Sequence, residues 1–456
     1  MRVALLVSVL VAGCGEAPAR PRTVPWSEPR YFLDEPRTGG ATTVDDTSPR
    51  GLGRVVNNLA PERWNDVLAG KQVFQRVWSP TPAPGPGAGL GPLYNAASCS
   101  GCHFLDGRGG PPSEVTPDVR LLARLAVGGA GDPIYGGQLS ELAEVGLPSE
   151  GRLVVDYAPR PVLLPDGTAI ATRRPVYRWE GAPWGAASPD VALSPRMPAA
   201  LAGLGLLEAI AAEDLVAAAD PDDRDGDGIS GRVSWVPDAV TGRRVLGRFG
   251  WKASQPMVEQ QIATAFREDM GLTSWVHPDG ACTPHQRACR DRDGAEEVSR
   301  RDLAVITDYV RLLAVPRRRE PSAPEVRRGR ELFLGIGCAG CHTPRHTTGE
   351  HPQLPELSRQ TIYPYTDLLL HDMGDELADG VREHEAAGRE WRTPPLWGLG
   401  LLRSIHGRLR LLHDGRARSV EEAVQWHGGE ARGAGRRYEA LATGERAMVV
   451  RFVESL

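Results

Sequence analysis

Apolar and polar positions follow two different patterns along this chain, and each pattern predicts an element. Apolar residues recur at helical spacing in the segments that begin at Gly70-Lys-Gln-Val-Phe74 and Gly329-Arg-Glu-Leu-Phe333, which predicts two amphipathic helices. Branched and aromatic residues on both sides of Pro165-Asp-Gly167 predict a β-hairpin. Pro- and Gly-rich loops interrupt the chain elsewhere, so the expected fold is mainly α, with long loops and a small β-hairpin insertion.

The N-terminal apolar run predicts export. It extends from Val3 to Val11, too few residues to span a bilayer as a mature helix, and Ala12-Gly13-Cys14 follows it. Small residues directly before a cysteine resemble the lipobox of bacterial lipoproteins. We therefore expect residues 1–14 to hold a lipoprotein signal peptide that is cut before Cys14, which would carry the lipid. In the alternative, the signal is an ordinary one and Cys14 is incidental.

This signal places the expected protein on the periplasmic side of the bacterial envelope, anchored through its N-terminal lipid. Gly15 favours the outer membrane, because it is not the Asp that retains many lipoproteins at the inner membrane. Residues 15–60 are rich in Pro, Arg, Gly and Thr, a composition that predicts a tether.

Composition and charge narrow the class of protein. With 456 residues, of which 41% are hydrophobic, the chain has enough material for two or three globular domains. Its 53 basic and 58 acidic residues give a formal charge of -5 without a basic stripe. Nucleic acid is therefore not an expected partner.

Four of the seven cysteines lie in two C-x-x-C-H motifs, CSGCH at 99–103 and CAGCH at 338–342. The motif suits haem c, because its two thiols can bond the two vinyl groups of a haem while the following His ligates the iron. A redox-active dithiol or structural zinc explains it less well, since neither needs the His in that place. We expect two covalently bound haem c groups, held by Cys99, Cys102 and His103 and by Cys338, Cys341 and His342.

The remaining pair, Cys282 and Cys289, flanks a short polar loop. In an exported chain a local disulfide is the simplest explanation for this pair. Metal binding with His277 or His285 is the alternative.

The segments around the two motifs repeat in the same order. LAGLGLLEAI at 201–210 is echoed by LWGLGLLRSI at 396–405, and WKASQPMVEQQ at 251–261 more faintly by HDGRARSVEEA at 413–423. This order predicts two cytochrome c-type haem domains that arose by internal duplication. They would span residues 61–315, with an insertion at 104–195, and residues 316–456.

Several long motifs resemble one known family. CHFLDGRGGPP, GLGLLEAI, GRFGWKASQP, EDMGLTS and HDGRARSVEEAVQWHGGEA are similar to segments of the di-haem oxidoreductase family, also labelled thiol oxidoreductase-like, which is related to bacterial di-haem cytochrome c peroxidases. The similarity covers most of residues 60–456. It implies an oxidoreductase with two haem domains.

The resemblance implies different ligands for the two haem irons. In the peroxidase relatives a Met is the distal ligand of haem 2, and the corresponding residue here is His427, so His342 and His427 would both ligate that iron. The corresponding residue for haem 1 is Ala265, which cannot ligate. We therefore expect an open iron position beside His103.

Other residues remain alternatives for these ligand positions. A methionine could ligate haem 1, and the candidates are Met197, Met257 and Met270. His371 and His413 are expected to be buried, hydrogen-bonded histidines.

The same resemblance assigns roles around haem 1. It matches Gln261 and Asp269 to a Gln and a Glu of the relatives. In the relatives the Gln orients peroxide, and the Glu moves a peroxide proton from one oxygen to the other. Glu268 is the alternative acid if the register slips, and an acidic pair on a helix surface is the structural alternative. Trp251 matches a Trp between the haems, which would relay an electron or hold a radical, or would simply pack in a core.

An acidic segment adds a candidate calcium site. Asp223, Asp225 and Asp227 have the spacing that opens an EF-hand loop, but no Glu stands at the twelfth position. A bound Ca²⁺ and a solvated acidic turn are both compatible with this segment.

Together these features predict a periplasmic di-haem c-type cytochrome with peroxidase-like activity. A small electron-donor protein, a cytochrome c or a copper protein, would reduce haem 2, and haem 1 would reduce peroxide or oxidise a substrate. Two other functions stay open: an electron-transfer cytochrome with both irons saturated, and an oxygenase-like use of haem 1.

Overall fold

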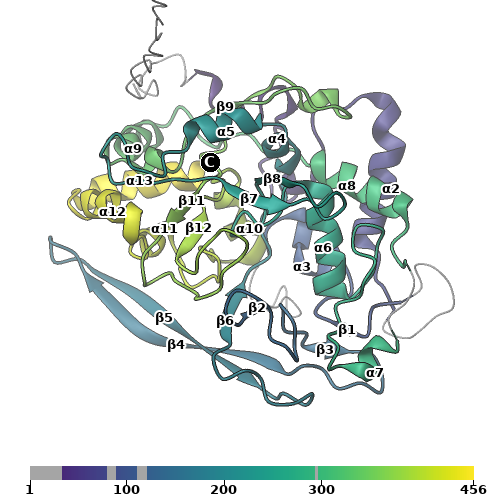
Figure 1. Ribbon diagram of the computed structural model, residues 1–456. Coiled ribbons are helices and arrows are strands. Elements are labelled where there is room, and N and C mark those ends of the chain that lie inside the picture. Colours follow the sequence, from purple (N-terminus) through teal and green to yellow (C-terminus); the bar gives the residue numbers. More distant parts are fainter. Residues whose placement is uncertain (1–32, 80–88, 110–120, 293–295) are drawn as a thin grey trace, which may run out of the picture.

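Two apolar cores organise the computed structural model, which describes residues 33–79, 89–109, 121–292 and 296–456 (Figure 1). The larger core is built mainly from the first half of the chain and includes Phe74, Phe266 and Tyr309. The second core is built mainly from residues 326–456 and includes Phe333 and Phe452. Helices supply more of both cores than strands do, and every sheet among the described residues has two strands, so the mainly α fold class is confirmed in outline.

Helix pairs form the frame of each half. In the first half α2 (Trp64–Gln75) and α6 (Val258–Met270) pack against α8 (Arg300–Arg311). In the second half α9 (Pro324–Gly335) packs against α13 (Thr443–Ser455). Both helices expected from the sequence are present, and α2 begins before the predicted segment.

The glycines of the two helical motifs lie where these helices cross. A Cβ on Gly70 in α2 would collide with the carbonyl oxygen of Val305 in α8, and one on Gly329 in α9 would collide with that of Met448 in α13. The missing side chain therefore lets each helix pair approach closely. The two halves share this feature, while their origin by duplication stays a prediction.

The other helices are short and connect the frame to the loops. None of the helices in the described ranges is long and apolar enough to cross a membrane. They are α3 (Cys99–Cys102), α4 (Leu204–Glu208), α5 (Ala212–Ala218), α7 (Arg287–Arg290), α10 (Leu402–His406), α11 (Val420–Val424) and α12 (Arg432–Glu439).

The predicted hairpin is confirmed. Strand β4 (Arg152–Leu163) pairs with antiparallel β5 (Ala169–Glu180), and Gly167 in the turn between them has a positive φ of 83°. Figure 1 shows the hairpin as a long arm that starts near β2 (Leu122–Ala126) and β6 (Ala192–Arg196). At its tip Asp166 pairs with Arg446 of α13 at 2.7 Å, so the arm fastens the insertion to the second half.

The remaining strands form small antiparallel pairs that the sequence did not reveal. Each is only two to four residues long, too short for a period of two to stand out. The pairs are β1 (Leu93–Tyr94) with β3 (Leu142–Ala143), β7 (Ser234–Pro237) with β8 (Arg244–Gly247), β9 (His346–Thr347) with β10 (Thr361–Ile362), and β11 (Leu370–Asp372) with β12 (Glu390–Arg392).

The tether predicted for residues 15–60 is wrong from residue 33 onward, because this part of the chain packs against the body of the protein. Glu35 is fully buried and pairs with Arg330 at 2.6 Å and with Arg318 at 3.4 Å. The Thr38 hydroxyl donates to the carbonyl oxygen of Pro316 at 2.8 Å. Residues 1–32, with the predicted signal and Cys14, lie outside the described residues.

Candidate functional site

Each C-x-x-C-H motif lines its own cavity. Cavity 1, of about 290 Å³, is lined by Cys99, Cys102 and His103 and by one side of α6. Cavity 2, of about 240 Å³, is lined by the segment 338–342 and by α11 and α12. Apolar side chains make up most of both walls, with a few polar groups among them, which suits a large flat cofactor.

The histidines of both motifs have one ring nitrogen fixed and the other left for a metal. Nδ1 of His103 donates to the carbonyl oxygen of Gly107 at 3.1 Å, and Nδ1 of His342 donates to that of Tyr365 at 3.0 Å. Burial lowers the pKa of His103 to about 4 and that of His342 to about 3, so both rings are neutral at pH 7. A neutral imidazole whose Nδ1–H is held by a carbonyl presents Nε2 as a ligand, which fits an iron site.

A third histidine with the same arrangement lies in cavity 2. His427 follows α11, lines the cavity and donates from Nδ1 to the carbonyl oxygen of Ala423 at 2.7 Å. It is close enough to His342 for a positive charge on His427 to lower the pKa of His342. Burial lowers the pKa of His427 itself. The structure therefore brings together the two histidines that the resemblance paired.

The four motif thiols are not activated. Burial raises the pKa of Cys99, Cys102 and Cys338 to about 12, and nearby Asp269 adds to the rise for the first two. A redox-active dithiol needs a thiolate of low pKa, so this environment disfavours that alternative. Cys282 and Cys289 are joined in a disulfide with a Cα–Cα distance of 5.9 Å.

Local structure explains how the first motif is presented. The Ser98 hydroxyl accepts a hydrogen bond from the backbone N–H of Gly101 at 3.1 Å and so caps the single turn of α3. This turn puts both thiols of the motif on the wall of cavity 1.

Asp269 and Gln261 both line cavity 1, as the resemblance implied. They lie on α6, which ends at Gly271 with a positive φ of 68°. Burial raises the pKa of Asp269 to about 6, and a hydrogen bond from Nε2 of Gln138 to its Oδ1, at 2.8 Å, opposes the rise. A carboxyl group with a pKa near neutrality can both accept and return a proton.

Glu268 has a different environment from its neighbour. It pairs with Arg124 at 3.3 Å and also with Arg267, so its carboxylate is already neutralised by two cations. Gln138 also donates to the backbone carbonyl of Glu268 at 2.8 Å. These contacts favour Asp269 over Glu268 as the group available for proton transfer.

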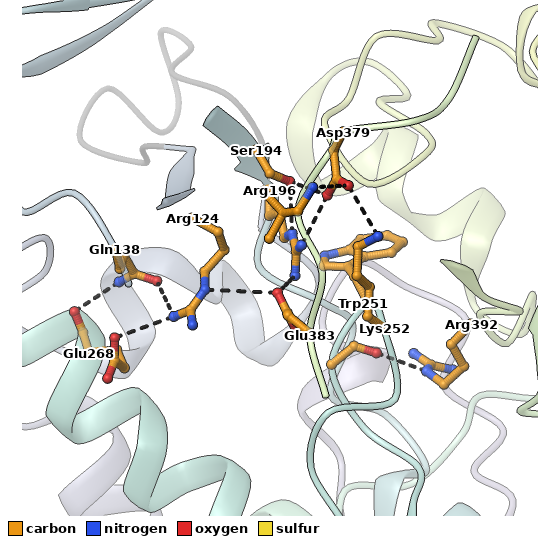
Figure 2. A network of polar contacts seen from close by, with 12 residues as sticks. Arg124, Gln138, Ser194, Arg196, Trp251, Lys252, Glu268, Asp379, Glu383 and Arg392 are labelled. Carbon is orange, nitrogen blue, oxygen red and sulfur yellow. Dashed lines mark hydrogen bonds and ion pairs between the residues drawn. The ribbon is translucent and has the colours of Figure 1, made fainter. Parts of the chain in front are cut away.

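A charged network continues from this point along the wall of cavity 1, as Figure 2 shows. Arg124 also lies 3.9 Å from Glu383, and Glu383 pairs with Arg196. Arg196 pairs with Asp379 at 3.1 Å, and Asp379 pairs with the buried Lys252 at 3.1 Å. Sequence reasoning missed this network, because its members come from β2, β6, the segment around Lys252 and the 379–383 loop, which no local motif connects.

Trp251 lines both cavities and therefore lies between them. Its indole N–H donates to the carbonyl oxygen of Met197 at 2.8 Å, and the guanidinium of Arg108 lies 5.1 Å from its ring centre. This position fits a group that connects the cavities.

Only some of the other residues considered as haem 1 ligands line cavity 1. Ala265, Met197 and Met270 line the cavity, whereas Met257 does not. The sulfur of Met197 lies directly against Gly415, where a Cβ would collide with it. Met197 therefore packs against the second half of the chain.

His371 and His413 are both buried, and His371 is hydrogen-bonded as expected. His371 pairs with Asp367 at 2.9 Å and with Glu430 at 2.7 Å, and the Asp367 carboxylate holds its pKa well above the usual range. The ring of His413 stacks on Trp391 with centroids 3.8 Å apart, and burial lowers its pKa to about 3.

The three aspartates of the candidate calcium site lie together. One oxygen from each of Asp223, Asp225 and Asp227 lies within 4.8 Å of the others, and two of the three residues are exposed. Their oxygens also accept backbone N–H bonds of the same loop, as from Gly228 to Asp223 at 3.1 Å. An acidic turn makes the same contacts, so calcium binding stays a prediction.

Comparison with known proteins places this site in a family. Residues 32–125 and 152–456 match the family model described as "Di-haem oxidoreductase, putative peroxidase". The matched ranges include both cysteine motifs and both cavities' histidines, and they omit residues 126–151, where Gln138 lies. No curated protein and no solved structure matches the chain. The chain belongs to the di-haem oxidoreductase family.

Proposed function

We propose that this protein is a periplasmic di-haem c-type peroxidase, in which cavity 1 is the reaction site and cavity 2 the entry point for electrons. One observation carries the proposal: the two cavities differ in their supply of histidine. Cavity 2 has His427 in addition to His342, each with Nδ1 held by a carbonyl. Among the described residues that line cavity 1, His103 is the only histidine.

The residues that would hold the haems follow from this difference. Cys99 and Cys102 would attach one haem, with His103 as its ligand. The second would be attached through the motif at 338–342, with both His342 and His427 as ligands. Bound haem would supply reversible one-electron chemistry at both cavities and, at cavity 1, a coordination position free for a small molecule.

Asp269 and Gln261 would handle the proton chemistry of peroxide reduction. The overall reaction takes up two electrons and two protons for each H₂O₂ and releases two molecules of water. Asp269, with a pKa of about 6, would take a proton from the near oxygen of peroxide and return it to the far oxygen. The Gln261 amide, on the same wall, would orient the peroxide, and Gln138 would keep the Asp269 carboxyl in place.

Electrons would reach cavity 1 through the boundary that Trp251 occupies. A small periplasmic electron-donor protein, a cytochrome c or a copper protein, would dock near cavity 2 and deliver them one at a time. The transfer step between the cavities is supported by the position of Trp251 on the walls of both.

Electron paramagnetic resonance of the haem-loaded protein tests the asymmetry directly. We expect one high-spin and one low-spin signal in the oxidised wild type, and a second high-spin signal in His427→Ala. His413→Gln is the matched control, because His413 lines the same cavity but stacks on Trp391, and it should keep the wild-type spectrum. Two low-spin signals in the oxidised wild type, with the remaining ferric haem still low-spin after half-reduction, would indicate an electron carrier and overturn the proposed peroxidase.

Export and anchoring form a separate part of the proposal. The signal at 1–14 and the cysteine that follows its small residues support a lipid on Cys14. Cell fractionation with mass analysis of the mature N-terminus tests it, and we expect Cys14→Ser to release the protein from the membrane fraction.

A further inference from the structure

Two buried arginines lie between cavity 1 and cavity 2. Arg108 and Arg392 line both cavities, and their exposed fractions are only 8% and 7%. Arg108 also covers one face of Trp251, and Arg392 follows directly after Trp391. Both side chains therefore lie at the boundary that the two cavities share.

Their hydrogen bonds use backbone oxygens only. Arg392 donates from Nε to Gly250 O at 2.9 Å and from Nη1 to Thr393 O at 3.0 Å. Arg108 donates from Nη2 to the carbonyl oxygen of Leu412, and its buried Nε has no hydrogen-bond partner in the described structure. Across the described ranges, neither arginine forms an ion pair with a carboxylate.

The nearest acidic groups are already engaged. The charge of Asp414 raises the pKa of Arg108, but Asp414 pairs with Arg416 at 2.7 Å and accepts a hydrogen bond from the Tyr177 hydroxyl. The charge of Asp367 raises the pKa of Arg392, but Asp367 pairs with His371 at 2.9 Å. Burial lowers the pKa of both arginines to about 10, which still leaves them charged at neutral pH. Two buried charges without a carboxylate partner among the described residues are unfavourable unless an anion joins them.

Three other arginines are neutralised in other ways. In the network of cavity 1, Arg124 and Arg196 each pair with carboxylates. Arg248 is as buried as Arg108 and also bonds only carbonyls, but these are Leu207 O and Ile210 O at the C-terminal end of α4, where the helix dipole is negative. Arg248 lines neither cavity.

We propose that Arg108 and Arg392 bind the propionate carboxylates of the two haems, the acidic groups on the rim of an otherwise apolar cofactor. This inference rests on the proposed function, since it requires haem in both cavities. A guanidinium fork matches a carboxylate in shape and charge, and a site without water strengthens the pairing. The positive charges would also favour the reduced state of the haems, because each reduction adds an electron beside them.

Replacement of each arginine by Met and by Lys tests the proposal. The measurements are haem content by mass and absorbance, and the midpoint potential of each haem by spectroelectrochemical titration. We expect Arg108→Met and Arg392→Met to lower the midpoint potential of at least one haem or to reduce the haem content. The Lys variants should have smaller effects than the Met variants, because Lys keeps the charge but not the guanidinium fork.

Arg248→Met is the matched control, a buried arginine outside both cavities, and it should leave the potentials unchanged. Wild-type potentials in both Met variants with two haems bound would overturn the proposal. So would equal effects of Met and Lys at both positions, because charge would then not be what the boundary requires. A wild-type chain that carries no haem would instead refute the proposed function, and the haem content separates that outcome from the others.

Discussion

At the scale of single residues, Asp269 and Glu268 are neighbours with opposite environments. Glu268 is neutralised by Arg124 and Arg267, whereas Asp269 is buried in cavity 1 with a pKa of about 6. We expect Asp269→Asn to lower kcat for peroxide by about 10²-fold or more, the usual contribution of a general acid/base. The haem content should not change. Glu268→Gln is the control, and an equal loss of kcat in that variant would contradict the assignment.

Gln138 provides a second prediction, which concerns pH. Asp269 must be ionised to take a proton, so kcat should rise with pH through about 6 and level off above it. The hydrogen bond from Gln138 lowers the pKa of Asp269, so its loss in Gln138→Leu raises that pKa. We expect the rise in kcat to move to higher pH in a stopped-flow or steady-state profile. An unchanged profile with a uniformly lower kcat would show that Gln138 acts through packing alone.

At the scale of elements, the close helix crossings in the two halves can be tested by a single methyl group. Gly329→Ala would place a Cβ against the carbonyl oxygen of Met448, and overpacking of this kind costs about 1–3 kcal/mol in the free energy of unfolding. Gly335→Ala in the same helix is the control, because a Cβ there meets nothing within 4 Å. We expect that control to be neutral or to stabilise by up to about 1 kcal/mol, since Ala favours a helix. Denaturant unfolding of the two variants measures the difference.

The elements that sequence alone predicted are those whose signal is local. The two C-x-x-C-H motifs, the hairpin around Gly167 and the helices at Gly70 and Gly329 each depend on residues within a few positions of one another. Gln138 could not be found this way, because it meets Asp269 across 131 positions of sequence and belongs to a segment outside the matched family ranges. The prediction of a tether was wrong for a related reason. Composition does not reveal that Glu35 forms an ion pair with Arg330 of α9.

At the scale of the whole molecule, the insertion and the second half of the chain together complete cavity 1. Arg124 and Arg196 come from the two strands at the base of the insertion, and Glu383 and Asp379 come from the second half. Ion pairs of this kind hold together parts of the chain that are distant in sequence. Cavity 1, the proposed reaction site, therefore depends on both halves, while each cysteine motif lies within one of them.

The boundary between the cavities carries the last prediction. If electrons cross at Trp251, then Trp251→Phe should slow the oxidation of the cavity 2 haem by peroxide several-fold in single-turnover stopped-flow experiments. The substitution keeps an aromatic ring but removes the indole N–H that bonds Met197 O at 2.8 Å. Trp391→Phe is the matched control, because Trp391 lines cavity 2 but not cavity 1. Equal rates in Trp251→Phe and the wild type would make Trp251 a packing residue, and electrons would then cross the boundary elsewhere, with the neighbouring Arg108 and Arg392 still setting the potentials on either side.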